Sequence, residues 1–291
     1  MKVLLTGAAG FIGMHTTLKL LARGDEVLGV DSLNTYYDPA LKQDRLAQLT
    51  TSDNFTFAHL DLSDALPTIA LFEKFKPQRV IHLAAQPGVR YSLSHPQTCL
   101  QNNIMAFANV LEACRQHAVE HLVFASSSSV YGSNTKMPYA PSDPVDHPLS
   151  LYAASKKANE LLAHVYSELY KMNFIGLRFF TVYGPWTRPD MAAYIFMKAI
   201  QENTPIDLFN KGKMIRDFTY IDDIVESLVR IIDKVATPNA SFDARHPDPA
   251  TSHAPYRIFN IGNNQPTPLM DYIEAIEAAL NKKAIRNLMD M

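Results

Sequence analysis

The feature that most constrains the fold is a set of three glycines near the start of the chain, in the segment Gly7-Ala-Ala-Gly10-Phe-Ile-Gly13. This segment follows a β-branched and leucine-rich run, residues 2–6, and opens a stretch with helical periodicity, residues 14–23. In such a turn, the first glycine permits a tight bend, the second lets the backbone approach a pyrophosphate, and the third lets helix and strand pack closely. The helix N-terminus then offers free N–H groups and a partial positive charge. The context predicts a dinucleotide-binding turn formed by Gly7, Gly10, Phe11, Ile12 and Gly13.

Beyond this turn, strand-like and helix-like segments alternate along the chain. Apolar segments typical of buried strands occupy residues 26–30, 55–60, 79–84, 121–125 and 176–180, and helical periodicity marks residues 65–75, 97–117 and 153–170. Strands that alternate with helices form parallel βαβ units with right-handed crossovers. We therefore expect an α/β fold with a doubly wound parallel sheet of the Rossmann type.

The alternation becomes irregular after residue 176, where prolines divide the chain into short segments. We expect residues 1–176 to form a dinucleotide-binding domain, to which the chain returns around residues 213–236. Residues 177–291 should form mainly a smaller C-terminal subdomain that covers the strand ends and binds the substrate. Residues 237–255 are rich in Pro, Ala, Ser, His and Asp and lack periodicity, which predicts a long surface loop.

Charge and cysteine usage exclude several classes of partner. The formal net charge of −2 gives no overall basic field, so we expect neither nucleic acid nor a membrane surface as a partner. The spacing of Cys99 and Cys114 fits no metal or redox motif, which favours buried, reduced thiols and no bound metal. The apolar start has a single lysine and no cleavage site, and no later run reaches the ~18 residues of a membrane span. We expect a cytoplasmic protein.

Polar and small residues follow several expected strands, at the edge where a doubly wound sheet binds its ligand. Asp31 ends the second strand, where a carboxylate accepts hydrogen bonds from an adenosine ribose and repels a 2′-phosphate. This favours NAD over NADP as the cofactor. The alternative is that Asp31 only caps the next turn. Further cofactor-binding candidates follow the third and fourth strands: Asp61, Leu62, Leu83, Ala84, Ala85 and Gln86.

Tyr152 and Lys156 lie four residues apart at the start of an expected helix, and hence on one face. A phenol with a pKa near ~10 is a poor base at neutral pH, but a nearby cation stabilises the phenolate. Such a pair on its own is most often a surface pair. Combined with the glycine turn, it predicts Tyr152 as the acid/base and Lys156 as the residue that tunes it, both against the cofactor.

A run of four serines, residues 126–129, follows the fifth expected strand. If the segment is extended, Ser127 and Ser129 point to one side and Ser126 and Ser128 to the other. Ser127 is our candidate for the hydroxyl that hydrogen-bonds the reacting oxygen of the substrate. A serine-rich turn without a chemical role is the alternative.

The chain resembles the extended short-chain dehydrogenase/reductases, in their NAD-dependent epimerase/dehydratase family. Within that group it is most similar to the bacterial UDP-glucuronate 4-epimerases. The resemblance spans essentially the whole chain and depends on residues 6–13, 82–86, 88–92, 126–132, 152–156, 177–192 and 216–223.

The resemblance implies a reaction at C4 of the sugar of a UDP-sugar. Tyr152 would remove the 4-hydroxyl proton while hydride leaves C4 for NAD, and hydride would then return to the other face of the 4-keto sugar. The resemblance also implies that Asn103 supports the lysine and the nicotinamide, and that Thr181 contacts the substrate. The helical segments 97–117 and 153–170 form a dimer interface in the family, so we expect a homodimer.

Two local features narrow the substrate. Ser128 and Ser129 stand where related dehydratases carry an Asp-Glu pair and related decarboxylases a Glu, so the acid needed for elimination is missing. Hydroxyls such as those of Ser129 and Thr181 could instead hold the sugar carboxylate. Guanidinium groups suit diphosphate or carboxylate, although surface arginines are usually solvated. On this basis we expect substrate binding by Arg90, by Arg188 near the sugar carboxylate and by Arg216 at the diphosphate.

These features favour UDP-glucuronate 4-epimerase, with UDP-glucose 4-epimerase and UDP-glucuronate decarboxylase as alternatives. A different class is an NAD-sensing module without turnover, but such proteins usually lose the tyrosine and lysine that this chain keeps. Family members generally continue some tens of residues beyond the helical segment 269–280. We therefore expect a substrate-binding subdomain that is truncated at its C-terminus.

Overall fold

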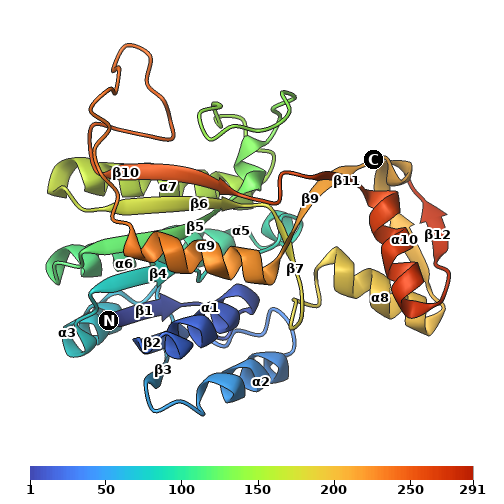
Figure 1. Cartoon of the computed structure of the whole chain (residues 1–291), viewed down its shortest axis with the longest axis horizontal. Helices are drawn as coiled ribbons and strands as arrows, with labels where there is room; N and C mark the ends of the chain where they lie inside the picture. Colours follow the sequence, from blue (N-terminus) through green and yellow to red (C-terminus); the bar gives the residue numbers. More distant parts are fainter. Residues whose placement is uncertain (291) are drawn as a thin grey trace. The chain divides into compact units, whose positions relative to one another are not determined.

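Seven parallel strands form the main sheet of the protein, in the order β3-β2-β1-β4-β5-β6-β10 (Figure 1). The computed structural model describes residues 1–290. The seven strands are β1 (Lys2–Thr6), β2 (Glu26–Asp31), β3 (Phe55–His59), β4 (Arg79–His82), β5 (His121–Ser127), β6 (Phe174–Phe179) and β10 (Tyr256–Ile261). Every neighbouring pair is parallel, and the order proceeds outward from β1 and β4 in opposite directions. The expected doubly wound α/β sheet is confirmed.

Nearly continuous apolar runs explain why these segments become buried strands. Val3, Leu4 and Leu5 of β1 have no exposed surface, and β6 is buried along its whole length. A parallel sheet with helices on both faces requires such runs instead of alternating polar residues. The exception is Arg178, a charged residue inside β6.

Helices cover both faces of this sheet (Figure 1). One face carries α1 (Phe11–Ala22), α2 (Pro39–Leu49) and α9 (Ile221–Asp233). Ion pairs from Lys19 to Glu226 and from Arg23 to Asp233 join α1 to α9. The other face carries α3 (Ala65–Phe75), α6 (Ala106–Gln116) and α7 (Leu151–Tyr170), which pack against one another in that order.

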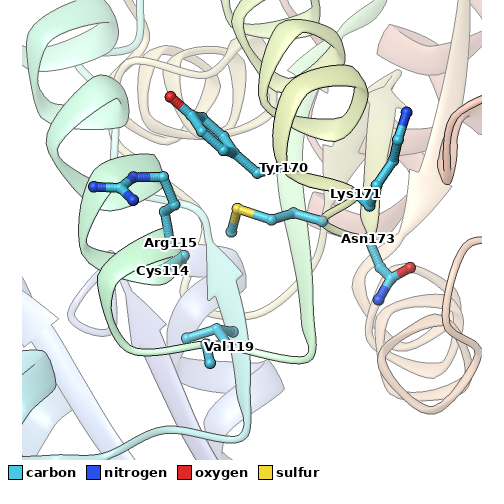
Figure 2. Close-up of a pocket in the computed structure, with 8 residues that line it drawn as sticks. Cys114, Arg115, Val119, Tyr170, Lys171 and Asn173 are labelled. Atoms are coloured by element: carbon cyan, nitrogen blue, oxygen red, sulfur yellow. The ribbon is translucent and has the colours of Figure 1, made fainter.

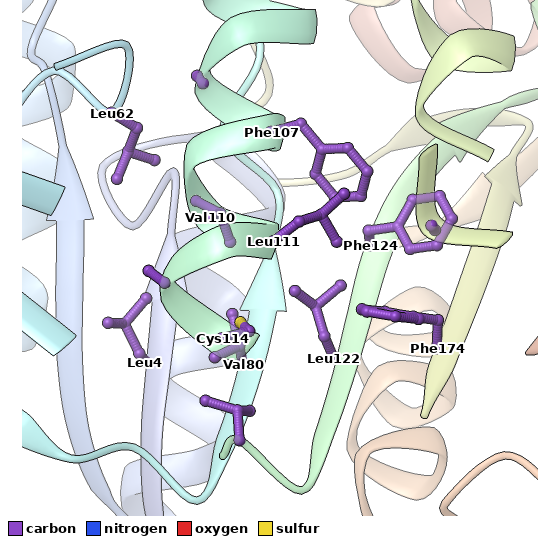
Figure 3. Close-up of a cluster of buried hydrophobic side chains, with 14 of the residues drawn as sticks. Leu4, Leu62, Val80, Phe107, Val110, Leu111, Cys114, Leu122, Phe124 and Phe174 are labelled. Atoms are coloured by element: carbon purple, nitrogen blue, oxygen red, sulfur yellow. The ribbon is translucent and has the colours of Figure 1, made fainter. Parts of the chain in front are cut away.

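The largest apolar core lies between α6 and the sheet (Figure 3). Phe107 and Leu111 project from α6 towards β4, β5 and β6, where they meet Phe124 and Phe174. The ring centroids of Phe107 and Phe124 are 5.1 Å apart. Burial of these aromatic side chains fixes α6, and the segment that precedes it, against the sheet.

The segment 97–117 does not form the single α-helix that its periodicity predicts. It folds as α5 (Pro96–Leu100), a π-helical turn η1 (Gln101–Met105) and α6. A π turn adds one residue to a helical turn, and the apolar spacing of the segment does not reveal it in the sequence. Such turns occur frequently at functional sites. Cys99 and Cys114 are buried and free of disulfides, as expected.

The connection between α9 and β10 contains the long loop predicted for residues 237–255. Apart from a single bridge between Thr251 and Arg257, no strand or helix forms there. The prediction of a surface loop is wrong for its last residues, because Ala250, Ser252 and Ala254 are buried. The hydroxyl of Ser252 lies 2.9 Å from Nε2 of His164 on α7, which ties the loop to that helix.

The chain divides into two compact units. The first comprises Met1–Phe179 and Ile224–Ile261, and the second comprises Phe180–Asp223 and Gly262–Met291. The second unit contains the small sheet β11-β9-β7 and the parallel pair β12-β8. Its elements are β7 (Thr181–Tyr183), α8 (Ala192–Glu202), β8 (Pro205–Leu208), η3 (Phe209–Gly212), β9 (Ile215–Tyr220), β11 (Pro266–Pro268), α10 (Leu269–Leu280) and β12 (Ile285–Leu288). Its core is formed by Phe196, Ile206, Leu208, Leu269 and Ile273.

None of the helices within residues 1–290 combines the length and the apolar character that crossing a membrane requires. The longest, α7, carries charged residues on several of its turns.

Replacing Phe107 by alanine should lower the free energy of unfolding by about 3–5 kcal/mol, because the side chain is fully buried and leaves a cavity. The matched control is Leu66→Ala on α3, where the leucine is 80% exposed. This change should stay within about 0.5 kcal/mol of the wild type. Urea unfolding followed by circular dichroism measures both; equal midpoints for the two variants would contradict the assignment of this core.

Candidate active site

The glycine turn connects β1 to α1 and packs against the chain that follows β4. Gly7 has a φ of +74°, and its N–H donates to the carbonyl of Val30 over 2.7 Å. A Cβ on Gly7 would lie 2.9 Å from the backbone nitrogen of Ala84, so a larger residue cannot fit there. A Cβ on Gly13 would collide with the carbonyl oxygen of Gly7. The turn therefore lies at the point between β1 and β4 where a doubly wound sheet binds its ligand.

The N-terminus of α1 is available to bind an anion. Gly10 is its N-cap residue, no side chain caps it, and its first turn contains no acidic residue. Phe11 is buried and Ile12 is partly buried at this end of the helix. The first N–H groups of a helix have no acceptor within it, and they add to the positive end of the helix dipole. The geometry suits a phosphate group in the way the glycine pattern predicts.

Asp31 ends β2 beside the glycine turn. Its carboxylate accepts hydrogen bonds from the backbone N–H of Ala9, at 3.2 Å, and of Leu33, at 2.9 Å. The second bond is the turn-capping contact that we considered as the alternative role. Binding of a ribose by the same carboxylate stays a prediction.

Two cations that no sequence motif singles out lie at the glycine turn, one of them beside Asp31. Nζ of Lys42 is 3.7 Å from the Asp31 carboxylate, and burial lowers the pKa of Lys42 while Asp31 acts in the opposite direction. Arg45 is fully buried and donates to the carbonyl of Ala9 over 3.1 Å. Both come from α2, so only the packing of α2 on α1 brings them to the glycine turn.

The other predicted cofactor residues lie at the carboxyl ends of β3 and β4. Asp61 is exposed and accepts the N–H of Ser63 at 2.9 Å, while Leu62 belongs to the apolar core. Leu83, Ala84 and Ala85 are partly buried and Gln86 is buried. Their contacts with a cofactor stay predictions.

His82, the last residue of β4, orders this edge of the sheet. Its Nδ1 lies 2.9 Å from the hydroxyl of Thr6, and that hydroxyl also accepts the N–H of Ala84 at 3.1 Å. Burial, together with the charge of Lys156, lowers the pKa of His82 to about 3, so the ring is neutral. The neutral ring contacts Thr6 of β1, which in turn bonds the segment after β4, and it adds no positive charge near Lys156.

Tyr152 and Lys156 lie on the first turns of α7, on the same side of the helix. Nζ of Lys156 is 6.0 Å from the centre of the Tyr152 ring. It donates a hydrogen bond of 2.9 Å to the carbonyl of Ala125 in β5. The side chain is only 2% exposed, and this burial lowers the pKa of Lys156 to about 8. Because that value lies close to neutral pH, the lysine can respond to a charge that develops on the neighbouring phenol.

Asn103 lies in the π-helical turn and joins three parts of the site. Its Oδ1 accepts the N–H of Gln86 at 2.7 Å, and its Nδ2 donates to the hydroxyl of Ser155 at 2.9 Å. The Ser155 hydroxyl in turn donates to the carbonyl of Tyr152 at 2.8 Å. The π turn thus connects the loop after β4 to the first turn of α7. A direct contact of Asn103 with nicotinamide stays a prediction.

The serine run is not extended throughout, and the predicted alternation of its side chains is wrong beyond Ser127. β5 ends at Ser127, and residues Ser128–Tyr131 form a 3-10 turn, η2. The hydroxyl of Ser127 accepts the N–H of Ser129 at 3.2 Å and so starts this turn. Ser128 and Ser129 are half-buried within it.

A buried ion pair joins α7 to β6 and also contacts the end of β5. Arg178 donates from Nε and from its second terminal nitrogen to the two carboxylate oxygens of Glu160, each over 2.9 Å. Neither side chain is more than 1% exposed. Glu160 also accepts the hydroxyl of Ser126 at 2.6 Å, and Arg178 donates to the hydroxyl of Tyr131 at 3.1 Å. Sequence reasoning missed this pair, although an arginine within an apolar strand was a usable signal.

The substrate-binding residues predicted from the family belong to different units. Arg90 is exposed in the loop after β4, in the first unit, with Ser127, Ser128 and Ser129. Thr181, Arg188 and Arg216 belong to the second unit. There Thr181 starts β7, Arg188 makes two hydrogen bonds to the carboxylate of Asp190, and Arg216 is exposed on β9. Their roles in binding substrate stay predictions.

A cavity of about 280 Å³ lies elsewhere in the first unit (Figure 2). Its lining includes Cys114, Arg115 and Tyr170 from the C-terminal ends of α6 and α7, together with Val119 and Asn173 just before β5 and β6. It therefore lies at the amino ends of the strands, opposite to the edge that carries the glycine turn. None of the predicted site residues lines it, and open α/β sheets bind their ligands at the carboxyl ends.

Comparison with known proteins agrees with this geometry. Residues 3–262 match the model of the NAD dependent epimerase/dehydratase family. The chain belongs to this family. The resemblance seen in the sequence is thereby confirmed, and so is the assignment to NAD-dependent enzymes.

Relatives in the epimerase/dehydratase family share the whole length of the chain. Protein CapI of Staphylococcus aureus is 52% identical over 291 residues, covering 100% of this chain and 87% of that protein. A probable UDP-glucuronate 4-epimerase of Rhizobium meliloti (strain 1021) is 45% identical, covering 100% and 86%. The crystal structure of UDP-glucuronic acid 4-epimerase from Bacillus cereus, in complex with UDP-glucuronic acid and NAD, superposes with a TM-score of 0.87 at 33% identity, covering 100% and 86%.

Replacing Glu160 by glutamine should destabilise the protein by about 3–5 kcal/mol, because it leaves the Arg178 charge buried without its partner. The matched control is Glu226→Gln, which removes an exposed carboxylate that pairs with Arg230 at 2.7 Å and with Lys19 at 3.7 Å. We expect the control to leave the urea midpoint unchanged, because exposed ion pairs contribute little. If both variants unfold at the same urea concentration, the buried pair does not contribute the stability assigned to it.

Proposed function

We propose that the protein is a UDP-glucuronate 4-epimerase, which interconverts UDP-glucuronate and UDP-galacturonate by transient oxidation at C4. The observation that carries the proposal is the placement of Tyr152 beside a buried Lys156, next to a serine turn without a carboxylate. The names of the relatives at 45% identity and of the Bacillus cereus structure support the choice of substrate.

The residues at the sheet edge fit NAD. Gly7 and Gly13 leave the turn without room for side chains, so its backbone packs closely, and the uncapped end of α1 suits a pyrophosphate. Asp31 is positioned to bind the adenosine ribose, with Lys42 compensating its charge. When bound, NAD would supply a reversible hydride acceptor for C4 of the sugar.

The chain itself supplies the proton chemistry. Tyr152 as phenolate takes the proton of the 4-hydroxyl and gives it back after the sugar has turned. The ammonium of Lys156 stabilises the phenolate, and the Ala125 carbonyl keeps that ammonium in place. Ser127, at the end of β5, donates a hydrogen bond to the reacting oxygen.

The serine turn argues against elimination and against loss of CO₂. Ser128 and Ser129 provide hydroxyl groups where elimination would need an acid or base. The 4-keto intermediate is a β-keto acid that loses CO₂ readily, so the site must hold its carboxylate in an unproductive orientation. Ser129 and Thr181 then hold the sugar carboxylate. Arg188 must share its guanidinium between Asp190 and that carboxylate, since it already makes two hydrogen bonds to Asp190. Arg216 binds the diphosphate, and Arg90 lies at the mouth of the site.

We assign NAD binding to the first unit and recognition of the sugar nucleotide mainly to the second. Both cysteines are free of disulfides, which suits a reducing compartment such as the cytoplasm.

Tyr152→Phe should abolish turnover of UDP-glucuronate and leave NAD bound, since only the phenol oxygen is lost. Chromatography of the nucleotide sugars measures conversion, and absorbance of the released cofactor measures NAD. For the wild type we expect UDP-galacturonate as the product. A UDP-pentose with CO₂ would identify a decarboxylase, and conversion of UDP-glucose alone would identify the other epimerase. Unchanged turnover in Tyr152→Phe would refute the role of the phenol.

We further propose a homodimer in which α7 of one copy packs against the same helix of a second copy. Leu161, Val165 and Leu169 recur every four residues on α7 and are 56%, 47% and 65% exposed. Residues at this spacing share one face of a helix, and such an exposed apolar stripe marks an interaction surface.

Sedimentation velocity tests the dimer. The double variant Leu161→Glu/Leu169→Glu should sediment as a monomer, because it places charges within the proposed interface. Leu66→Glu, at an exposed leucine of α3, is the control and should sediment as the wild type does. A monomeric wild type, or an unaffected double variant, would overturn this arrangement.

A further inference from the structure

We propose that Ser92 is a positioning residue for the reaction: it fixes the start of α7 and thereby places the phenol of Tyr152 against Lys156 and the sugar. The proposal rests on the proposed function, because it concerns the acid/base of that same site. Ser92 itself touches neither Lys156 nor the reacting atoms in our assignment.

The hydroxyl of Ser92 joins two parts of the chain that are 60 residues apart. It accepts the backbone N–H of Tyr152 at 3.2 Å and donates to the carbonyl of Val89 at 2.7 Å. The side chain is only 1% exposed. The hydroxyl thus uses its one donor and one of its acceptor positions in hydrogen bonds within the protein.

The Tyr152 N–H is one that α7 itself cannot satisfy. Tyr152 is the second residue of the helix, and the first four N–H groups of a helix have no acceptor within it. The N-cap residue Ser150 accepts the N–H of Ala153 at 3.1 Å. Ser92 therefore acts as a second cap, supplied from outside the helix, at the residue that carries the chemistry.

The carbonyl of Tyr152 is held as well. Ser155 donates to it at 2.8 Å, and Nδ2 of Asn103 donates to the Ser155 hydroxyl at 2.9 Å. The two peptide groups that flank the Tyr152 side chain are thus fixed from different elements. Ser92 acts from the short helix α4 (Tyr91–Ser94), and Asn103 acts from the π turn through Ser155. Movement of the Tyr152 backbone, from which the phenol projects, then needs movement of these elements.

The loop that leads into α4, the helix of Ser92, is itself tightly held. Gly88 has a φ of +106°, and a Cβ there would lie 2.7 Å from the hydroxyl of Tyr36. The N–H of Ser92 donates to the carbonyl of Gly88 at 3.0 Å, and the Tyr91 ring stacks on His95 at 4.0 Å. The same loop carries Arg90, a predicted substrate contact. A rigid loop of this kind sets the position of Tyr152 relative to whatever binds beside it.

Proton transfer depends steeply on such placement, since a shift of about 1 Å in a reacting group can lower the rate about 100-fold. We expect Ser92→Ala to lower kcat at least 10-fold while KM for UDP-glucuronate and the amount of bound NAD stay within twofold of the wild type. The amount of bound NAD is the control for folding, because a loss of folded protein would also lower the apparent kcat without changing KM. A lower kcat with both bound NAD and KM unchanged indicates a loss of positioning.

The matched control is Ser150→Ala, which removes a cap hydrogen bond from the same helix end without touching the loop after β4. Both variants are assayed well below their midpoints of thermal unfolding. We expect Ser150→Ala to keep kcat within twofold of the wild type. If Ser92→Ala does not fold, Ser92→Cys replaces it, since the sulfur is a weak acceptor at the same position; it should lower kcat with KM unchanged. A kcat within twofold of the wild type for Ser92→Ala or Ser92→Cys, or an equal loss in Ser150→Ala, would overturn the proposal.

The wild type is assayed first, which separates this proposal from the proposed function. If it leaves UDP-glucuronate unchanged but converts UDP-glucose, the substrate assignment fails and the variants are compared on UDP-glucose instead. A normal wild type with an unaffected Ser92→Ala refutes only the role of Ser92. No conversion of either sugar by the wild type would overturn both.

Discussion

The buried ion pair between Glu160 and Arg178 is the interaction on which the rest of the site depends. Taking two charges out of water is unfavourable unless both are fully hydrogen-bonded, and here each carboxylate oxygen meets a guanidinium nitrogen at 2.9 Å. Glu160 lies one turn after Lys156 on α7, and Ser126, which donates to Glu160, precedes Ser127 on β5. The pair thus holds the helix that carries Tyr152 and Lys156 against the strand that ends in the serine turn.

The cofactor edge is organised by a different constraint, the close approach of backbone to backbone. Gly7 packs on Ala84 and Gly13 packs on Gly7, so the turn has no room for side chains. The charges around it are balanced locally, with Lys42 and Arg45 from α2 near Asp31 and the helix end. Together the two constraints place the uncapped end of α1 and the Tyr152–Lys156 pair at one edge of a single sheet, within the first unit.

Much of this arrangement was readable from the sequence, because its signals are local. The glycine spacing, the strand–helix alternation and the Tyr-Lys pair each depend on residues within a few positions of one another. Predictions failed where the deciding contact was distant. The π turn of residues 101–105 keeps an apolar spacing that looks α-helical, and the end of β5 at Ser127 is set by the hydrogen bond that starts η2. The buried end of the loop before β10 was missed because Ser252 meets His164 on a remote helix.

The sequence by itself determined the fold class, the family and the identity of the residues that could do the chemistry, since periodicity and motif spacing encode all three. Only the tertiary structure decided how those residues are held. Ser92 reaches Tyr152, Arg178 meets Glu160, and Lys42 approaches Asp31 because the sheet and its helices bring distant segments together. The burial that lowers the pKa of Lys156 to about 8 likewise depends on packing between α7 and β5. Desolvation and hydrogen-bond geometry arise from the packed surroundings of a side chain, and no local pattern specifies them.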